Sequence, residues 1–189
     1  FAEERSGDVP FEKDNEYEQN LWGNIANHLT VNQPISVEIA REIKQFLISH
    51  EYSTIFHAPS QPVVQRGMAV DQSYIMNVLG VSNLNDIETK GDKEANFTFR
   101  PKKDVGATSW TTDLNVAKKF CDDSFTNRND VKLIIYARVE DNPNKFWDFD
   151  KFYNMQGLNM MDNIMLEDEV LGLGSIKAYK ITWEIVESD

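Results

Sequence analysis

The sequence predicts an α+β protein, in which helices come first and mostly antiparallel strands follow. Up to about residue 50, apolar side chains recur at helical spacing. After about residue 60, the chain changes to short β-type runs with small helices between them. Apolar residues make up 41% of the chain and aromatic residues 11%, which is typical of a globular protein. A length of 189 residues suits one domain with its own core.

The first part of the chain divides into an arm and a helical region. Residues 1–15 are charged and contain Gly7 and Pro10, so we expect a flexible arm or a linker from a longer chain. Residues 16–58 are expected to be helical, and the clearest helix follows Pro34 with Ser36 as its N-cap. Its apolar stripe has i, i+4, i+7 and i+8 spacing and consists of Ile39, Ile43, Phe46 and Leu47.

Residues 60–187 form the expected β-rich core, within a single domain that spans residues 16–189. Two short helices are predicted there, one between Asp71 as N-cap and Gly80 as C-cap, and one that begins after Asp113. Alternating or continuous apolar runs predict the strands, which are PVVQRGM (62–68), ANFTFRP (95–101), GATSWT (106–111), VKLIIYARV (131–139), VLGLG (170–174) and YKITWEIVE (179–187). The first of these strands is expected to end at Gly67.

Charge and residue counts argue against several kinds of site. The net charge is −12, with 31 acidic and 19 basic residues, which opposes direct nucleic-acid binding and an anionic membrane surface and favours a basic protein partner. Cys121 is the single cysteine, so no internal disulfide forms, and three scattered histidines argue against a zinc site. We therefore expect no metal. The apolar runs are shorter than the ~20 residues that a membrane-spanning helix needs.

The first candidate site residue is Arg66, which follows an apolar run and directly precedes Gly67. A guanidinium group beside a residue without a side chain is able to bind a phosphate or a carboxylate through two hydrogen bonds. The alternative is an exposed arginine on an edge strand.

The second candidate stretch is Ser109-Trp110-Thr111. By the alternation of a strand, it places two hydroxyl groups on one face and the indole on the other. Hydroxyls at alternate positions suit the bracing of a carboxylate or contact with a ribose. The alternative is ordinary β-propensity, with Thr112 and Asp113 capping the helix that follows.

The third candidate stretch is Glu167-Asp168-Glu169, directly before an apolar strand. With a period of two, Glu167 and Glu169 share one face, and their mutual repulsion raises the pKa of at least one of them. Such a pair suits a site where a cation is bound or where positive charge develops on a sugar. The alternative is a solvated acidic turn, which is common in so acidic a protein.

Taken in order, these three stretches resemble the arginine-serine-glutamate class of mono-ADP-ribosyltransferases. That family has a strand ending in Arg-Gly, a Ser-Thr-Ser strand and a Glu-X-Glu motif. The stretch EDEVLGLGSIKAYKI (167–181) is the most specific match, and the resemblance covers roughly residues 60–186. The middle motif departs from the family pattern, since it reads Ser-Trp-Thr here. The resemblance implies two packed, mostly antiparallel β-sheets with an N-terminal helical region.

The resemblance also implies a role for each matching residue. Arg66 would hold the phosphates of NAD+, and Ser109 would form a hydrogen bond to Glu169. Glu169 would bind the ribose 2′-hydroxyl of the nicotinamide side and stabilise positive charge, while Glu167 would orient an acceptor arginine and help to remove its proton. These four are the expected catalytic residues. The residues expected to contact NAD+ are Arg66, Gly67, Ser109, Trp110, Thr111, Phe120 and Glu169; Phe120 is equally suited to the core.

The resemblance predicts transfer of ADP-ribose from NAD+ to an arginine of a target protein by a monomeric enzyme. The compact spacing is similar to the Alt and Mod enzymes of T-even phages. This similarity implies a phage effector that acts on host RNA polymerase or a related protein, in the cytoplasm of the host or target cell. The open alternatives are an NAD+ glycohydrolase, an actin-modifying bacterial toxin and a non-catalytic partner-binding domain of the same fold.

Overall fold

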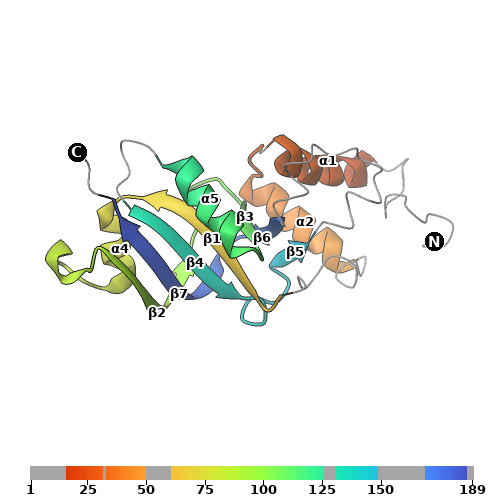
Figure 1. Ribbon diagram of the computed structural model, residues 1–189. Coiled ribbons are helices and arrows are strands. Elements are labelled where there is room, and N and C mark those ends of the chain that lie inside the picture. Colours follow the sequence, from red (N-terminus) through yellow and green to blue (C-terminus); the bar gives the residue numbers. More distant parts are fainter. Residues whose placement is uncertain (1–15, 32, 50–60, 126–130, 149–168, 187–189) are drawn as a thin grey trace.

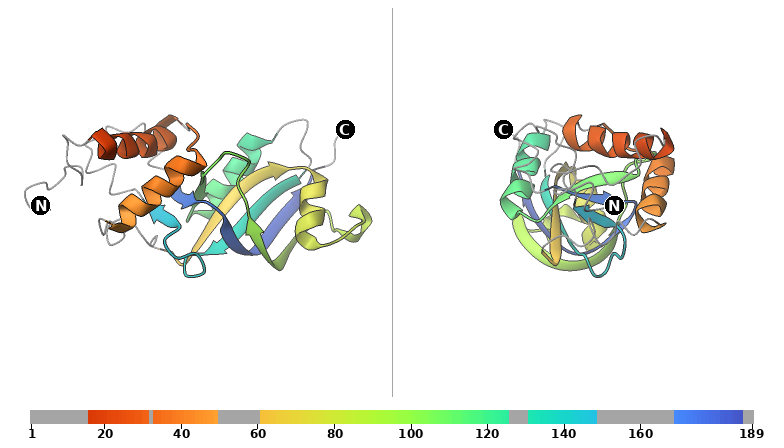
Figure 2. Two further views of the ribbon diagram at one scale, coloured as in Figure 1. Left: turned by 180° about the vertical axis from the view of Figure 1, so that it is seen from behind. Right: turned by 90° about the vertical axis from the view of Figure 1, so that its right-hand side faces the viewer.

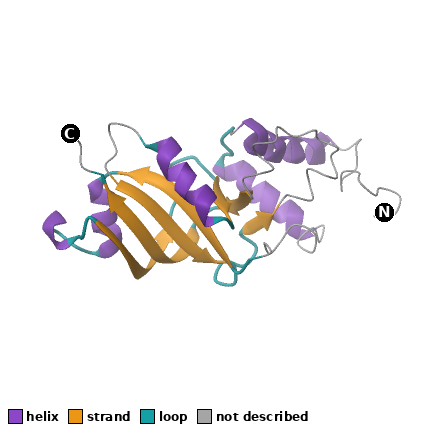
Figure 3. Cartoon of the chain, in the orientation of Figure 1, coloured by secondary structure: helices purple, strands orange, loops and turns teal. Residues whose placement is uncertain are grey.

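A computed structural model describes residues 16–31, 33–49, 61–125, 131–148 and 169–186 (Figure 1). The helices are α1 (Glu16–Val31), α2 (Val37–Ser49), α4 (Gln72–Leu79) and α5 (Leu114–Ser124), with a short 3-10 helix at Leu84–Asp86. The strands are β1 (Val63–Val70), β2 (Lys90–Phe99), β3 (Ala107–Thr111), β4 (Val131–Arg138), β5 (Phe146–Asp148), β6 (Glu169–Leu173) and β7 (Ile176–Ile185). The predicted α+β class is confirmed (Figure 3). The expected arm at residues 1–15 lies outside the described residues.

The described strands form one antiparallel sheet in the order β2-β7-β4-β1-β3-β6-β5. The expectation of two packed sheets is therefore wrong, because the pair Gln65–Thr111 joins β1 to β3. This junction is narrow: β1 pairs with β4 along its whole length, from Val63 to Val70, but with β3 at that one position. The sheet thus consists of a four-stranded half and a three-stranded half that share a single link.

The two halves face one another around Trp110, which is fully buried. Its indole ring contacts Phe99 at the end of β2, with ring centroids 5.6 Å apart, and Phe146 in β5, at 5.4 Å. Since β2 and β5 are the two outer strands of the sheet, the sheet must curl for both to reach one side chain (Figure 2). The main core lies inside this curl, where side chains of both halves bury apolar area.

Helices α2, α4 and α5 begin at the N-capping residues that the sequence predicted, and α4 also ends at its predicted C-cap. Asp71 accepts a hydrogen bond from Tyr74 N at the start of α4, and Gly80 ends α4 with a left-handed φ of 69°. Asp113 accepts from Asn115 N at the start of α5, and Ser36 Oγ accepts from Ile39 N at the start of α2. These contacts satisfy amide groups that have no partner within the helix.

Strand β1 is longer than predicted, because it continues through Gly67 to Val70. Gly67 is required there by the close approach of α5, which packs across β1 and β4 (Figure 1). A Cβ atom at position 67 would lie 1.8 Å from the carbonyl oxygen of Ala117 and 3.1 Å from Cys121 Sγ. The glycine therefore marks a helix crossing and not a strand end.

We expect Gly67→Ala to lower the free energy of unfolding by about 1–3 kcal/mol, because the added methyl group pushes α5 off the sheet. Urea unfolding followed by circular dichroism measures this loss. The matched control is Gly23→Ala in α1, where an added Cβ meets no atom within 4 Å and alanine favours the helix. Equal stability of the Gly67→Ala variant and the unchanged chain would contradict the close packing.

The helical region lies at one end of the sheet, next to β3, β5 and β6 (Figures 1 and 2). Backbone hydrogen bonds attach it there: Gly106 N donates to Ile35 O at 2.7 Å, and Gly174 N donates to Gly106 O at 2.8 Å. The segment before α2, the start of β3 and the turn between β6 and β7 are thus tied to one another. Within the described ranges, no helix is long and apolar enough to cross a membrane.

Candidate functional site

A cleft of about 840 Å³ opens where the two halves of the sheet meet. Three neighbouring strands each contribute a polar side chain to its lining: Arg66 from β1, Ser109 from β3 and Glu169 from β6. Phe120 of α5 and His28 of α1 also line the cleft. With Gly67 of β1, which also lines the cleft, the structure therefore brings together five of the residues that the sequence singled out and adds a histidine from the helical region.

The cleft lies beside the narrow junction between β1 and β3. Past the single pair Gln65–Thr111, no further β1–β3 backbone pair forms within the described strands. The side chain of Arg66 spans this opening, because its Nη1 atom donates a hydrogen bond of 2.9 Å to Ser109 O. A guanidinium group thus contacts a strand carbonyl that the ladder leaves available, and it is fixed in place at the wall of the cleft.

Arg66 is a largely buried cation with remaining hydrogen-bonding capacity. Its Nε atom is buried and has no hydrogen-bond partner within the described part of the chain. The guanidinium carbon lies 5.5 Å from the centroid of the Phe99 ring. Burial lowers the pKa of Arg66, and favourable interactions with Tyr74 and Glu169 partly offset this effect. An anion in the cleft would both stabilise the positive charge of Arg66 and accept hydrogen bonds from its remaining donors.

Glu169 is the first residue of β6 and is partly buried. It lies opposite Thr111 in the β3–β6 ladder, and its charge stabilises the protonated form of Arg66. A carboxylate and a guanidinium thus line the same cleft from either side of β3. The predicted partner Glu167 and the intervening Asp168 lie outside the described residues.

The contact that Ser109 makes differs from the predicted hydrogen bond to Glu169. Its Oγ atom lies 3.3 Å from His28 Nε2, whereas the residue opposite Glu169 in the ladder is Thr111. His28 Nδ1 lies 3.0 Å from Gln33 O, and because a carbonyl oxygen only accepts, Nδ1 carries the proton. In the neutral imidazole, Nε2 is then the acceptor, so the Ser109 hydroxyl donates to it. The histidine thereby fixes the direction of the hydroxyl group.

The structure corrects the expected roles of Trp110 and Thr111. Trp110 is fully buried in the core, where its Nε1 atom donates to Thr108 Oγ1 at 2.8 Å, and it is absent from the described lining of the cleft. Thr111 is also fully buried, and its Oγ1 atom accepts from Asp113 N at 3.0 Å. The threonine therefore helps to form the turn into α5. Phe120 is half-buried on α5 and does line the cleft.

Among the lining residues that the sequence did not single out, His28 contacts Ser109, and Tyr74 and Phe99 interact with Arg66. Burial raises the pKa of Tyr74, which keeps the phenol protonated beside Arg66. Each residue belongs to a helix or strand whose local pattern indicates only burial. His28 is 81 positions from Ser109, and no motif in the sequence connects the two.

We expect His28 to make the stability of the protein depend on pH. Burial lowers its pKa below 6.5, nearby Arg66 lowers it further, and the bond to Gln33 O opposes the shift. The neutral form therefore stabilises the fold fully above pH ~6.5, and this contribution is lost as the pH falls below that value, because the unfolded chain takes up the proton first.

Urea unfolding of the unchanged chain and of His28→Gln from pH 8 to pH 5 tests this expectation. The difference in unfolding free energy should shrink toward acid by up to about 1.4 kcal/mol per pH unit. The comparison cancels the contributions of the other two histidines, which both chains contain. A difference that stays constant across this range would contradict the assignment.

Among the described residues, no group of three or more histidine, cysteine, aspartate or glutamate side chains is arranged to hold a metal ion. Comparisons with protein-family models, with curated proteins and with solved structures found no match for this chain. The chemistry of the cleft therefore has to be argued from its own residues. It combines a fixed guanidinium group, a carboxylate, an oriented hydroxyl group and aromatic rings.

Proposed function

We propose that the protein is an NAD+-dependent ADP-ribosyltransferase that modifies an arginine side chain of a target protein. The observation that carries the proposal is the meeting of Arg66, Ser109 and Glu169 from three adjacent strands at one cleft. These are the positions at which the sequence resembles the arginine-serine-glutamate transferases. The volume of the cleft, about 840 Å³, falls within the range of ~300–1,000 Å³ that is usual for small-molecule sites.

The reaction exchanges one bond at the C1′ carbon of a ribose. The bond to nicotinamide breaks, and nicotinamide leaves with the bonding electrons. A nitrogen of the acceptor arginine then forms the new bond and loses a proton. Positive charge develops on the ribose as the first bond breaks, so a carboxylate fixed beside it lowers the barrier. In this proposal, Glu169 is that carboxylate and binds the 2′-hydroxyl group.

Arg66 would bind the phosphate groups of NAD+. Its guanidinium is already fixed by Ser109 O, and its Nε donor has no hydrogen-bond partner within the described part of the chain. Ser109, whose hydroxyl group is directed by His28, would keep the ribose side of the cleft ordered. Glu167 keeps the role that the resemblance gives it, which is to orient the acceptor arginine and accept its proton.

The deciding experiment is incubation of the protein with NAD+ labelled in its ADP-ribose part, together with a cell lysate and, separately, with free arginine. Nicotinamide release and label on protein are both measured, for the unchanged chain, Glu169→Gln and Glu167→Gln. We expect label on protein, which both variants lose. Because Glu167 acts on the acceptor, nicotinamide release in water should persist in Glu167→Gln.

Other outcomes select the alternatives. Nicotinamide release without any label on protein or arginine would show that the activity is NAD+ hydrolysis and not transfer. The absence of turnover and of NAD+ binding would leave a partner-binding domain. If label is transferred, the labelled host protein distinguishes a phage effector acting on RNA polymerase from a toxin acting on actin.

A further inference from the structure

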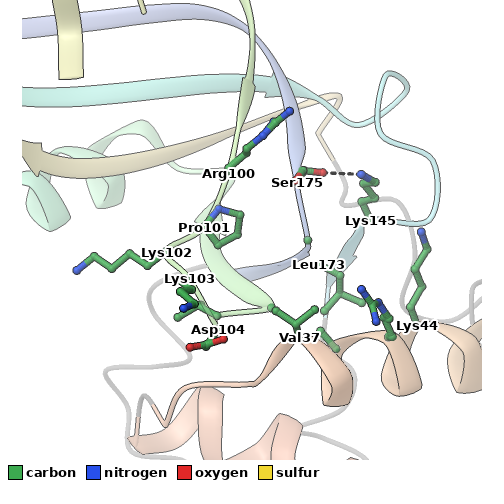
Figure 4. A pocket seen from close by; sticks show the side chains of 15 residues that line it. Val37, Lys44, Arg100, Pro101, Lys102, Lys103, Asp104, Lys145, Leu173 and Ser175 are labelled. Atoms are coloured by element: carbon green, nitrogen blue, oxygen red, sulfur yellow. Dashed lines mark hydrogen bonds between the residues drawn. The ribbon is translucent and has the colours of Figure 1, made fainter. Parts of the chain in front are cut away.

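A second pocket, of about 440 Å³, lies between α2, the segment that joins β2 to β3, and the turn between β6 and β7 (Figure 4). Its described lining contains one acidic residue, Asp104. Basic side chains dominate the lining, and they are Arg41, Lys44, Arg100, Lys102, Lys103 and Lys145. In a chain with a net charge of −12, this is a marked local excess of positive charge. We refer to it as the basic pocket.

The cations of the basic pocket outnumber the acidic residues of its described lining by six to one. Within the described ranges, none of the six forms an ion pair. Lys145 Nζ donates to Ser175 O at 2.5 Å, which is a neutral acceptor (Figure 4). Burial lowers the pKa of Lys145, and the charges of Lys44 and Lys177 lower it further. An anion bound among these groups would relieve their mutual repulsion.

The shape of the basic pocket selects a small ligand. Its volume lies within the range of small-molecule sites, and its basic residues come from three separate segments, which are α2, the segment that joins β2 to β3, and the residue before β5. Apolar side chains lie among the charged ones: Val37 and Ala40 on α2, Pro101 and Val105 on the joining segment, and Leu173 in β6. These suit the uncharged part of a ligand whose other end carries several negative charges.

We propose that the basic pocket binds a compact polyphosphate, such as the di- or triphosphate chain of a nucleotide. Each arginine is able to donate two parallel hydrogen bonds to two oxygens of one phosphate group, and the lysines act as point charges around it. This site is distinct from the cleft in which the proposed reaction would take place. Arg100, Pro101, Lys102 and Val105 line both, whereas Arg41, Lys44 and Lys145 line the basic pocket alone. The two sites therefore share one wall.

Isothermal titration calorimetry with inorganic tripolyphosphate, ATP and adenosine tests the proposal. We expect tripolyphosphate and ATP to bind, adenosine not to bind, and affinity to fall as salt is added. The double variant Arg41→Glu/Lys44→Glu should weaken binding at least about tenfold, because it replaces two charged partners by repulsive groups. Both positions lie on α2, and Arg41 is exposed, so the substitution leaves the core intact.

The matched control is Lys118→Glu/Lys119→Glu, which makes the same change of charge at two exposed positions on α5 outside the basic pocket. It should bind tripolyphosphate as the unchanged chain does. Arg66→Lys, which should weaken phosphate binding in the cleft, should leave the binding of tripolyphosphate unchanged, because Arg66 does not line the basic pocket, and this result separates the two sites. Equal losses in the two double variants, binding of ATP without binding of tripolyphosphate, or no binding at low salt would each overturn the proposal.

Discussion

The variant Glu169→Gln is expected to lower the rate of nicotinamide release from NAD+ by about a hundred- to a thousandfold in a protein that remains folded. The amide has almost the shape of the carboxylate but lacks its negative charge, so it cannot stabilise the positive charge that develops on the ribose. Because this charge arises in the transition state, the loss should appear mainly in kcat and only weakly in KM. Measuring both constants by nicotinamide release distinguishes this role from one in substrate binding.

The matched control for this variant is Glu94→Gln, an exposed position in β2 outside the described lining of the cleft. It removes the same charge from the same kind of element, so it should keep the rate of the unchanged chain. Thermal unfolding of both variants shows whether the fold is retained. A folded Glu169→Gln variant with undiminished turnover would rule out the proposed role of this carboxylate.

The second large effect is expected for Arg66→Lys, which should weaken the binding of NAD+ by about ten- to a hundredfold. Lysine keeps the positive charge but lacks the planar fork of donors. One ammonium group cannot both donate to Ser109 O, as Arg66 Nη1 does, and present further donors to a phosphate. Equilibrium binding of NAD+ to variants that also contain Glu169→Gln measures the effect without turnover.

The control for this substitution is Arg138→Lys in the adjacent strand β4. Arg138 is partly exposed, stacks on Tyr179 at 3.7 Å from the ring centroid and lies outside the described lining of the cleft. Its replacement should leave NAD+ binding unchanged. If both lysine variants bind NAD+ as tightly as the parent chain, then Arg66 does not hold the cofactor.

The features that the sequence predicted well are local ones. The caps at Ser36, Asp71 and Asp113 were predictable because each side chain contacts an amide group two or three residues away. Strand alternation likewise put Trp110 on the face opposite to Ser109. Its expected contact with a cofactor did not follow from that alternation, and the indole lies in the core.

The features that the sequence predicted poorly depend on contacts between distant segments. The sequence predicted the end of β1 incorrectly because Gly67 is required by the close approach of the α5 backbone, which lies about fifty positions further along the chain. Whether β1 and β3 belong to one sheet or two depends on the single pair Gln65–Thr111. The contact between His28 and Ser109 requires the helical region to dock on the sheet, which no local pattern encodes.

That docking has a consequence for how the protein could be shortened or rearranged. The strands from β1 onward contain Arg66, Ser109 and Glu169, so they look sufficient as a minimal unit. His28 comes from α1, however, and the bond between Ile35 O and Gly106 N fixes the connection to α2 at the start of β3. A fragment that begins at β1 would expose the Ser109 hydroxyl to water and leave it free to rotate. The two N-terminal helices are therefore an integral wall of the cleft, and their removal should abolish function even where the sheet still folds.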